Sequence, residues 1–165
     1  MEDLSTIKML TTLFHLLSCR KIFLFVQKLL SFVEMTSAEL CFNLRLQAAS
    51  AANNCAAISA KYDNRTDLAT IAYEFMSEAF LTYEAEITES SAQKAAMMKI
   101  IGVLLCCNRF QKSDYETLIT KATQNSARLL KKTDQCSMVL MCSHLFFKDE
   151  VGLNLELFPF SRNFT

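Results

Sequence analysis

An apolar stripe at helical spacing runs through residues 72–87. Its members are Phe75, Met76, Ala79, Phe80, Tyr83 and Ile87. Separations of three and four residues place these side chains on one face of an α-helix. The polar positions between them offer no nucleophile beside a base and no set of metal ligands. We therefore interpret this segment as a packing helix.

Glycine and proline, the residues that most often make turns, are scarce. The 165 residues include two Gly and one Pro, and 52% of the chain is hydrophobic. This leaves little material for tight turns or strand edges, so the sequence predicts an all-α fold. Thirteen Phe and eight Met are a large apolar content for one small domain. We expect part of this apolar surface to face a neighbouring protein.

Charge and hydropathy exclude two classes of partner. Seventeen basic and seventeen acidic side chains balance, so the electrostatic surface of a nucleic-acid binder is not expected. Residues 1–35 are apolar, but charged side chains interrupt them, and no piece approaches the roughly 20 apolar residues that span a bilayer. Glu2 and Asp3 are the wrong start for an export signal. We expect a soluble, cytoplasmic protein.

The cysteines are odd in number, and several lie within apolar helical pattern. We expect buried free thiols at Cys41, Cys106, Cys107 and Cys142. A zinc site at Cys136, Cys142 and His144 is the alternative, but the short Cys-x2-Cys spacing and a second ligand pair are missing. We expect no metal and no cofactor. Asn64 and Asn163 match the glycosylation acceptor pattern by chance in this compartment.

Helix starts can be located from capping patterns. A hydroxyl lies three residues before Glu or Gln at Thr36, Ser90 and Ser113, and Asp134 is a further candidate N-cap. We predict helices that begin near residues 37, 66, 91, 114 and 135, with one or two more before residue 35. Short polar joints between them bring successive helices back antiparallel.

Two further segments support a stacked arrangement. Residues 95–107 are apolar nearly all round, which indicates a helix buried on several sides. Residues 114–131 carry one clean stripe, and the distances between helix starts approach the length of helical-hairpin repeats. The stripe consists of Tyr115, Leu118, Ile119, Ala122, Ser126 and Leu129. The sequence therefore predicts an α-solenoid of stacked antiparallel helical hairpins, a HEAT-like superhelix.

Catalytic chemistry has little support. The two histidines, His15 and His144, lie within apolar pattern, and no nucleophile or orienting acid can be assigned to either. A phosphate-binding loop needs more glycine than the chain contains. The alternative hypothesis is a small helical enzyme of unknown class that uses His144 or a cysteine. An activity-based thiol probe would discriminate it from a non-catalytic binding module.

Several runs of residues resemble one known family. They are the run from Ala72 to Ile87, Ala92-Gln93, Ile100-Ile101-Gly102, the run from Ser126 to Gln135, and Cys142-Ser143-His144-Leu145-Phe146. Together they look like the C-terminal half of the large retromer subunit, the family of vacuolar protein sorting-associated protein 35. The resemblance covers roughly residues 21–147.

The resemblance implies a fold and a function. The family subunit is an α-solenoid that scaffolds a cytosolic coat on endosomes and returns membrane-protein cargo to the trans-Golgi network or the plasma membrane. Its C-terminal half cradles a subunit with a metallophosphoesterase-like fold. We therefore expect a non-catalytic scaffold that binds this subunit, with cargo tails or sorting nexins as further candidates. Association with the endosome membrane is expected to be peripheral, on the cytosolic face, and only through the complex.

The chain departs from the family pattern in two respects. The family subunit is several times longer, so its half that binds an arrestin-like subunit has no counterpart here. We expect a single solenoid fragment over residues 1–147, followed by a divergent, irregular tail over residues 148–165. The candidate partner-binding residues are Glu74, Glu78, Arg128 and Lys132. The plain alternative for each of them is solvated surface.

Overall fold

The computed structural model describes residues 19–59 and 67–147, and these residues form helices without any strand. A helical segment covers residues 19–34. It is followed by α2 (Ala38–Ser59), α3 (Asp67–Glu86), α4 (Ser90–Cys106), α5 (Lys112–Ala127) and α6 (Lys132–Phe146). Each predicted helix start lies within three residues of the observed one. The predicted all-α fold is confirmed.

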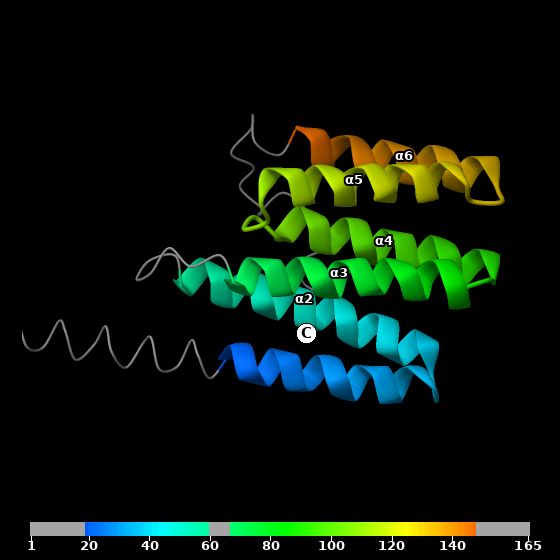
Figure 1. Cartoon of the computed structure of the whole chain (residues 1–165). Coiled ribbons are helices and arrows are strands. Elements are labelled where there is room, and N and C mark those ends of the chain that lie inside the picture. The colour runs from blue at the N-terminus through cyan, green and yellow to red at the C-terminus, as the bar shows by residue number, and fades with distance from the viewer. Residues whose placement is uncertain (1–18, 60–66, 148–165) are drawn as a thin grey trace, which may run out of the picture.

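The helices lie side by side in chain order (Figure 1). α2 packs against α3, and α4 packs against both α5 and α6. Next-but-one helices also touch, because α2 contacts α4, α4 contacts α6 and α3 contacts α5. These contacts define two rows, one of α2, α4 and α6 and the other of α3 and α5. Such a two-row stack of antiparallel helices is an α-solenoid, as predicted.

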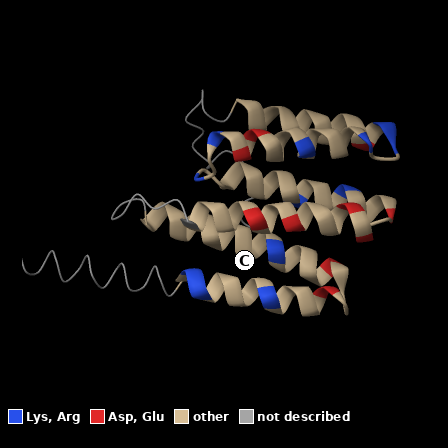
Figure 2. Cartoon of the chain, in the orientation of Figure 1, with Lys and Arg blue, Asp and Glu red and all other residues tan. Residues whose placement is uncertain are grey.

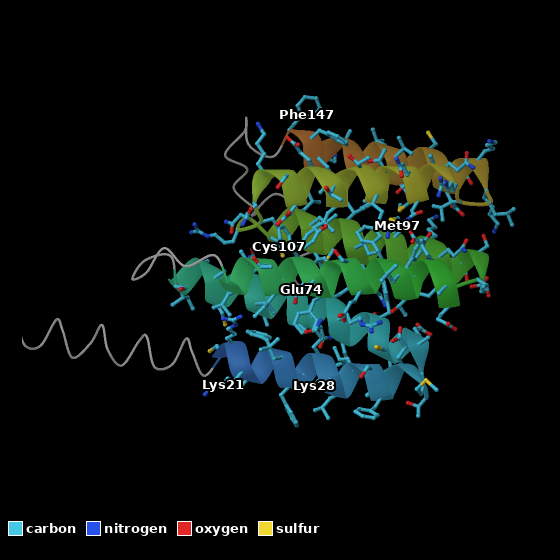
Figure 3. All side chains as sticks on the ribbon, viewed as in Figure 1. Lys21, Lys28, Glu74, Met97, Cys107 and Phe147 are labelled. Atoms are coloured by element: carbon cyan, nitrogen blue, oxygen red, sulfur yellow. The ribbon has the colours of Figure 1, made fainter. Side chains whose placement is uncertain are left out.

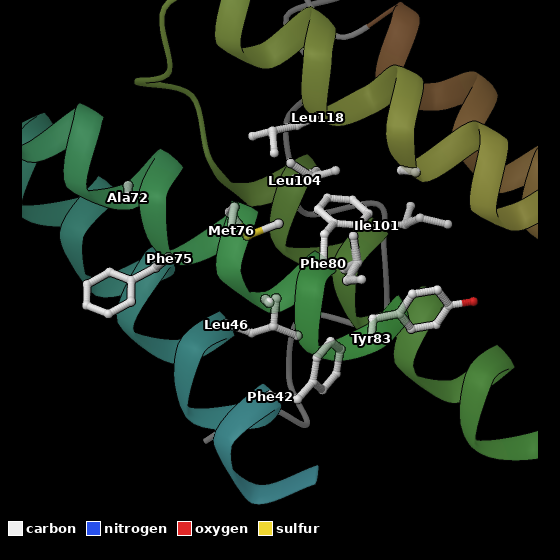
Figure 4. Close-up of a cluster of buried hydrophobic side chains, with 14 of the residues drawn as sticks. Phe42, Leu46, Ala72, Phe75, Met76, Phe80, Tyr83, Ile101, Leu104 and Leu118 are labelled. Atoms are coloured by element: carbon white, nitrogen blue, oxygen red, sulfur yellow. The ribbon is translucent and has the colours of Figure 1, made fainter. Parts of the chain in front are cut away.

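The core lies between the two rows (Figure 4). All six members of the apolar stripe, five on α3 and Ile87 directly after it, are buried, with exposed fractions of 0 to 8%. Phe42 and Leu46 of α2 meet this stripe from one side, and Ile101 and Leu104 of α4 extend the same core. α4 is buried on several sides, because it contacts helices of both rows. The predicted packing roles of these two segments are confirmed.

The helix caps differ from the predicted ones. The N-cap of α4 is Glu89, whose carboxylate accepts hydrogen bonds from the N–H groups of Ser91 and Ala92 at 3.0 and 2.7 Å. The cap predicted at Ser90 is therefore wrong. Gln93 instead donates from Nε2 to the carbonyl oxygen of Ile87 at 2.9 Å. A carboxylate can thus fill the capping role that sequence patterns assign to hydroxyl groups.

The caps predicted for the other helices are also wrong. Ser37, not Thr36, accepts the N–H of Leu40 at the start of α2, at 3.4 Å. The residue at the N-cap position of α5 is Gln111, so Ser113 already lies inside the helix. α6 begins after Lys131, and Asp134 lies in its first turn. A negative charge there suits the positive end of the helix dipole.

At least one polar contact joins each pair of next-but-one helices. Each of these contacts pairs side chains that lie at least 40 residues apart in the sequence. They are Gln27 with Glu78 at 2.6 Å, Lys99 with Asn43 at 2.8 Å, Asn125 with Glu84 at 2.9 Å and Lys94 with Asp134 at 2.7 Å. Apolar packing tolerates sliding better than directed hydrogen bonds do. We infer that these contacts fix the register of the stack.

Candidate functional site

The four charged candidates lie in two separate places, on α3 and at the connection between α5 and α6. Glu74 and Glu78 are one turn apart on α3, and Glu74 is exposed (Figure 3). Arg128 and Lys132 are exposed and flank the connection between α5 and α6. Lys132 Nζ donates to Oε1 of Gln135 at 3.2 Å. The structure thus does not gather the four side chains into one site.

Glu78 is held inside the fold by a polar junction of three helices. Its Oε1 accepts a hydrogen bond from Gln27, and its Oε2 lies 3.2 Å from Nε of Arg45. Arg45 is buried on α2 and also binds the carboxylate of Glu34 and the hydroxyl of Thr82. This junction joins the helical segment 19–34 to α2 and α3.

The electrostatics of the junction favour the ionised forms. The hydrogen bond from Arg45 lowers the pKa of Glu34, against an opposing effect of burial. Burying the guanidinium requires such partners, because an unpaired buried charge is costly. The junction is a structural ion cluster. Sequence reasoning missed it because Arg45 and Glu34 lie on different helices.

The outer side of α4 carries no charge along its centre line. It consists of Ala95, Met98, Gly102 and Cys106, which follow one another at helical spacing. A Cβ atom added at Gly102 would meet nothing within 4 Å, so the packing of the described residues does not require glycine there. Glycine inside a helix costs about 1 kcal/mol relative to alanine. The backbone of α4 is therefore open to close approach from outside.

The neighbouring helices of the same row continue this surface. α2 and α6 each bury the side that faces the other row. Their exposed sides therefore point outward, as the exposed side of α4 does. Their outward centre lines are also uncharged, with the exposed Leu40, Gln47, Ala51, Asn54 and Ile58 on α2 and the exposed Cys136 and Leu140 and half-buried Ser143 on α6. We call these twelve residues of α2, α4 and α6 the neutral face. Depletion of charge is typical of the centre of a protein–protein interface.

Among the predicted candidates, Lys132 borders the neutral face. It lies four residues before Cys136 and eight before Leu140, so it shares their side of α6. Glu74 belongs to the other row, whose exposed side also carries Glu84, paired with Lys121 at 3.2 Å. A glycine within a helical pattern was the signal that could have located the neutral face.

The thiols do not assemble a reactive or metal-binding site. Cys142 is buried, with Sγ 3.4 Å from Oγ of Ser126, whereas Cys136 and His144 lie on the exposed side of α6. In the described ranges, no three His, Cys, Asp or Glu side chains come together as metal ligands. Burial raises the pKa of Cys142, which disfavours the nucleophilic thiolate. The predicted burial of Cys106 is wrong, since it is exposed at the end of α4.

Two other features bear on the sequence predictions. Asn64, Asn163 and His15 lie outside the described residues. Among the helices of the described part of the chain, none combines the length and apolar character that a membrane crossing needs.

Comparison with known proteins gives a consistent match. The family model of vacuolar protein sorting-associated protein 35 matches residues 7–159. The vacuolar protein sorting-associated proteins 35C and 35B of Arabidopsis thaliana are 44% and 46% identical to the chain over 117 and 112 residues, which is 71% and 68% of the chain. The protein 35 of Schizosaccharomyces pombe is 39% identical over 116 residues, or 70% of the chain.

The matched part is a small share of each relative. The chain spans 13% of the length of these three curated proteins. The family-model match continues past Phe147, where the resemblance noted in the sequence ends. The family-model match covers all six helices of the described residues. The chain belongs to the family of vacuolar protein sorting-associated protein 35.

Proposed function

We propose that this chain is a non-catalytic scaffold element of the retromer coat, which returns membrane-protein cargo from endosomes to the Golgi or the plasma membrane. The proposed direct partner is the phosphoesterase-like subunit of that coat. Cargo tails and sorting nexins are further candidates. The proposed location is the cytosolic face of the endosome membrane, reached through the complex. Family membership and the solenoid architecture support this function.

The neutral face is the observation that carries the proposal. The centre lines of three helices in one row carry no charge, and the open Gly102 lets another backbone approach α4. A stable contact needs roughly 800 Å² per partner, which a row of three helices can supply. Exposed Leu40, Ile58 and Leu140 provide apolar area that gains from burial. We place the centre of the partner contact on this face.

The four charged candidates differ in how close they lie to the proposed contact. Lys132 lies at the edge of the neutral face, where polar rim residues are expected, and Arg128 flanks the same connection. Glu74 would contribute only if the partner bound the row of α3 and α5. Glu78 is already bound to Gln27 and Arg45, so we assign it to stability.

A scaffold role suits the chemistry of the described residues better than catalysis does. The buried thiols of Cys41 and Cys142 have raised pKa values, caused first by burial. His144 is exposed on α6, whereas these two thiols are buried. An activity-based thiol probe that labelled one cysteine stoichiometrically in the native chain would favour the enzyme alternative.

The test is co-elution and titration calorimetry of the full chain with the phosphoesterase-like subunit of the same organism. We expect a complex, weaker than that of a full-length family member, because the chain spans 13% of such a protein. Gly102→Trp should weaken binding at least about tenfold by blocking close approach. Gly102→Ala adds only a methyl group into open space, so it should bind nearly as the unaltered chain does.

Comparing Glu74→Lys with Gly102→Trp identifies which row of helices binds the partner. Glu74→Lys on α3 should change the affinity less than about twofold if the neutral face is the interface. Loss of binding in Glu74→Lys, with Gly102→Trp unaffected, would move the interface to the other row. Absence of any complex with a chain shown to be folded by circular dichroism would refute the proposed partner.

A further inference from the structure

A groove lies where α3 ends and α4 begins, beside the first turns of α2. Its volume is about 190 Å³. Phe42, Ile87 and Ala96 are buried and contribute apolar lining, together with the more exposed Ala38 and Ala92. The lining is thus mostly apolar and offers room for an aliphatic side chain.

The rim of the groove is acidic. Glu39, Glu86 and Glu89 line it and are exposed. The one cation in the lining is Lys99, whose Nζ donates to Oδ1 of Asn43 at 2.8 Å. Three carboxylates against one ammonium group leave negative charge in excess within the lining, and Lys131, outside the lining, offsets part of the charge of Glu89. Figure 2 shows acidic positions in red at this end of the stack.

Two of these carboxylates are explained by the helices that they flank. Glu89 caps the N-terminus of α4, and Glu39 lies in the first turn of α2, where the helix dipole favours a negative charge. Their placement stabilises the fold whether or not a ligand binds. They therefore do not by themselves indicate a binding site.

Glu86 has the opposite placement. It is the last residue of α3, where the dipole disfavours a negative charge, and the last turn of α3 contains no basic residue. Glu84, two residues earlier, is paired with Lys121 at 3.2 Å and Asn125 at 2.9 Å. No such pair forms for Glu86 within the described ranges. Its carboxylate is placed where a cation from outside would relieve an unfavourable charge.

We propose that this groove binds a basic segment of a partner protein, which inserts an aliphatic side chain and pairs flanking Lys or Arg residues with Glu86 and Glu39. The apolar lining requires the aliphatic anchor, and the excess of carboxylates selects its basic neighbours and repels acidic ones. This inference does not depend on the proposed function. Its test uses no retromer subunit.

The probe is the peptide acetyl-Lys-Leu-Lys-amide, titrated into the isotope-labelled full chain and followed by backbone amide NMR. Shifts should concentrate at residues that line the groove, such as Ala38, Thr88 and Ala92. Raising the salt from about 20 mM to about 300 mM should weaken binding severalfold, because exposed charges are then screened. Acetyl-Glu-Leu-Glu-amide and acetyl-Lys-Ser-Lys-amide should produce smaller shifts, since each lacks one recognised feature.

Matched variants complete the test. Glu86→Gln should weaken the basic peptide about two- to fivefold, whereas Glu116→Gln, an exposed glutamate on α5 outside the groove, should leave it unchanged. Ala92→Leu should fill the groove and remove the shifts while preserving the helix. Equal binding of the acidic peptide, shifts confined to other surfaces, or equal effects of the two Gln variants would overturn the proposal.

Discussion

Arg45 on α2 forms a bidentate ion pair with Glu34, which lies at the end of the preceding helical segment. Nη1 lies 2.7 Å from Oε1, and Nη2 donates to Oε2 at 3.0 Å. The Arg45 side chain is 7% exposed and that of Glu34 is 34% exposed. The hydroxyl of Thr82 on α3 lies 2.9 Å from the same carboxylate. The pair therefore ties three helices together around a buried guanidinium, whose carboxylate partners Glu34 and Glu78 are both partly exposed.

Arg45→Ala should destabilise the chain by about 3 kcal/mol. The substitution leaves the carboxylates of Glu34 and Glu78 without their shared cation, and breaking a buried ion pair from one side is strongly destabilising. Arg128→Ala removes an exposed arginine and should change the free energy of unfolding by less than about 0.5 kcal/mol. Urea unfolding of both variants measures the difference. Equal effects would mean that the junction contributes nothing beyond surface charge.

The stabilisation by Glu34 should depend on pH in the acid range. Its folded pKa is lowered, so its contribution is fully present above the unfolded value of about 4.3 and is lost as the pH falls through the folded pKa. The free-energy difference between the unaltered chain and Glu34→Gln should stay constant from about pH 7 to pH 5. It should shrink below about pH 4. A difference that already declines near pH 6 would contradict the assignment.

The helices could be predicted because their signal is local and repeated. Two apolar stripes predict which side of a helix is buried, one from Phe75 to Ile87 and one from Tyr115 to Leu129. The structure buries those sides. Because glycine and proline are scarce, few segments were alternative candidates for turns. Polar joints located the chain reversals. Each of these properties depends on neighbours within one or two helical turns.

The caps and the polar junction could not be predicted in the same way. Glu89 caps α4 because its backbone is extended just before the first turn, which no spacing rule specified. Glu78 fits a solvated helix face by spacing, yet Gln27 and Arg45 reach it from other helices. Gly102 looks like part of an apolar run, and only the packing of the helices shows that open space lies beside it. Such features depend on which helices become neighbours in space.

Phe80 and Leu81 are adjacent on α3 and should respond very differently to truncation. Phe80 is fully buried between the rows, whereas Leu81 is 60% exposed. Phe80→Ala should cost about 3–5 kcal/mol through lost burial and the cavity that remains. Leu81→Ala should cost less than about 1 kcal/mol. Chemical denaturation of the two variants tests the assignment of the stripe, and a reversed order would place the core on the other side of α3.

Alkylation of the native chain should separate the seven cysteines by burial. Cys106 and Cys136 are exposed, Cys19 and Cys55 are half-buried, and Cys41, Cys107 and Cys142 are buried. Burial raises the pKa of Cys41 and Cys142, so little thiolate forms there at neutral pH, and packing blocks the reagent as well.

Intact mass after a short iodoacetamide pulse should therefore show two fast adducts, at the two exposed cysteines. Unfolding in guanidinium should raise the number to seven, the full cysteine count. The double variant Cys106→Ser and Cys136→Ser should lose the fast adducts and keep the same unfolding midpoint, since neither side chain is packed. Fast modification of Cys142 in the native chain would instead show that α5 and α6 separate readily, against the close packing around Ser126.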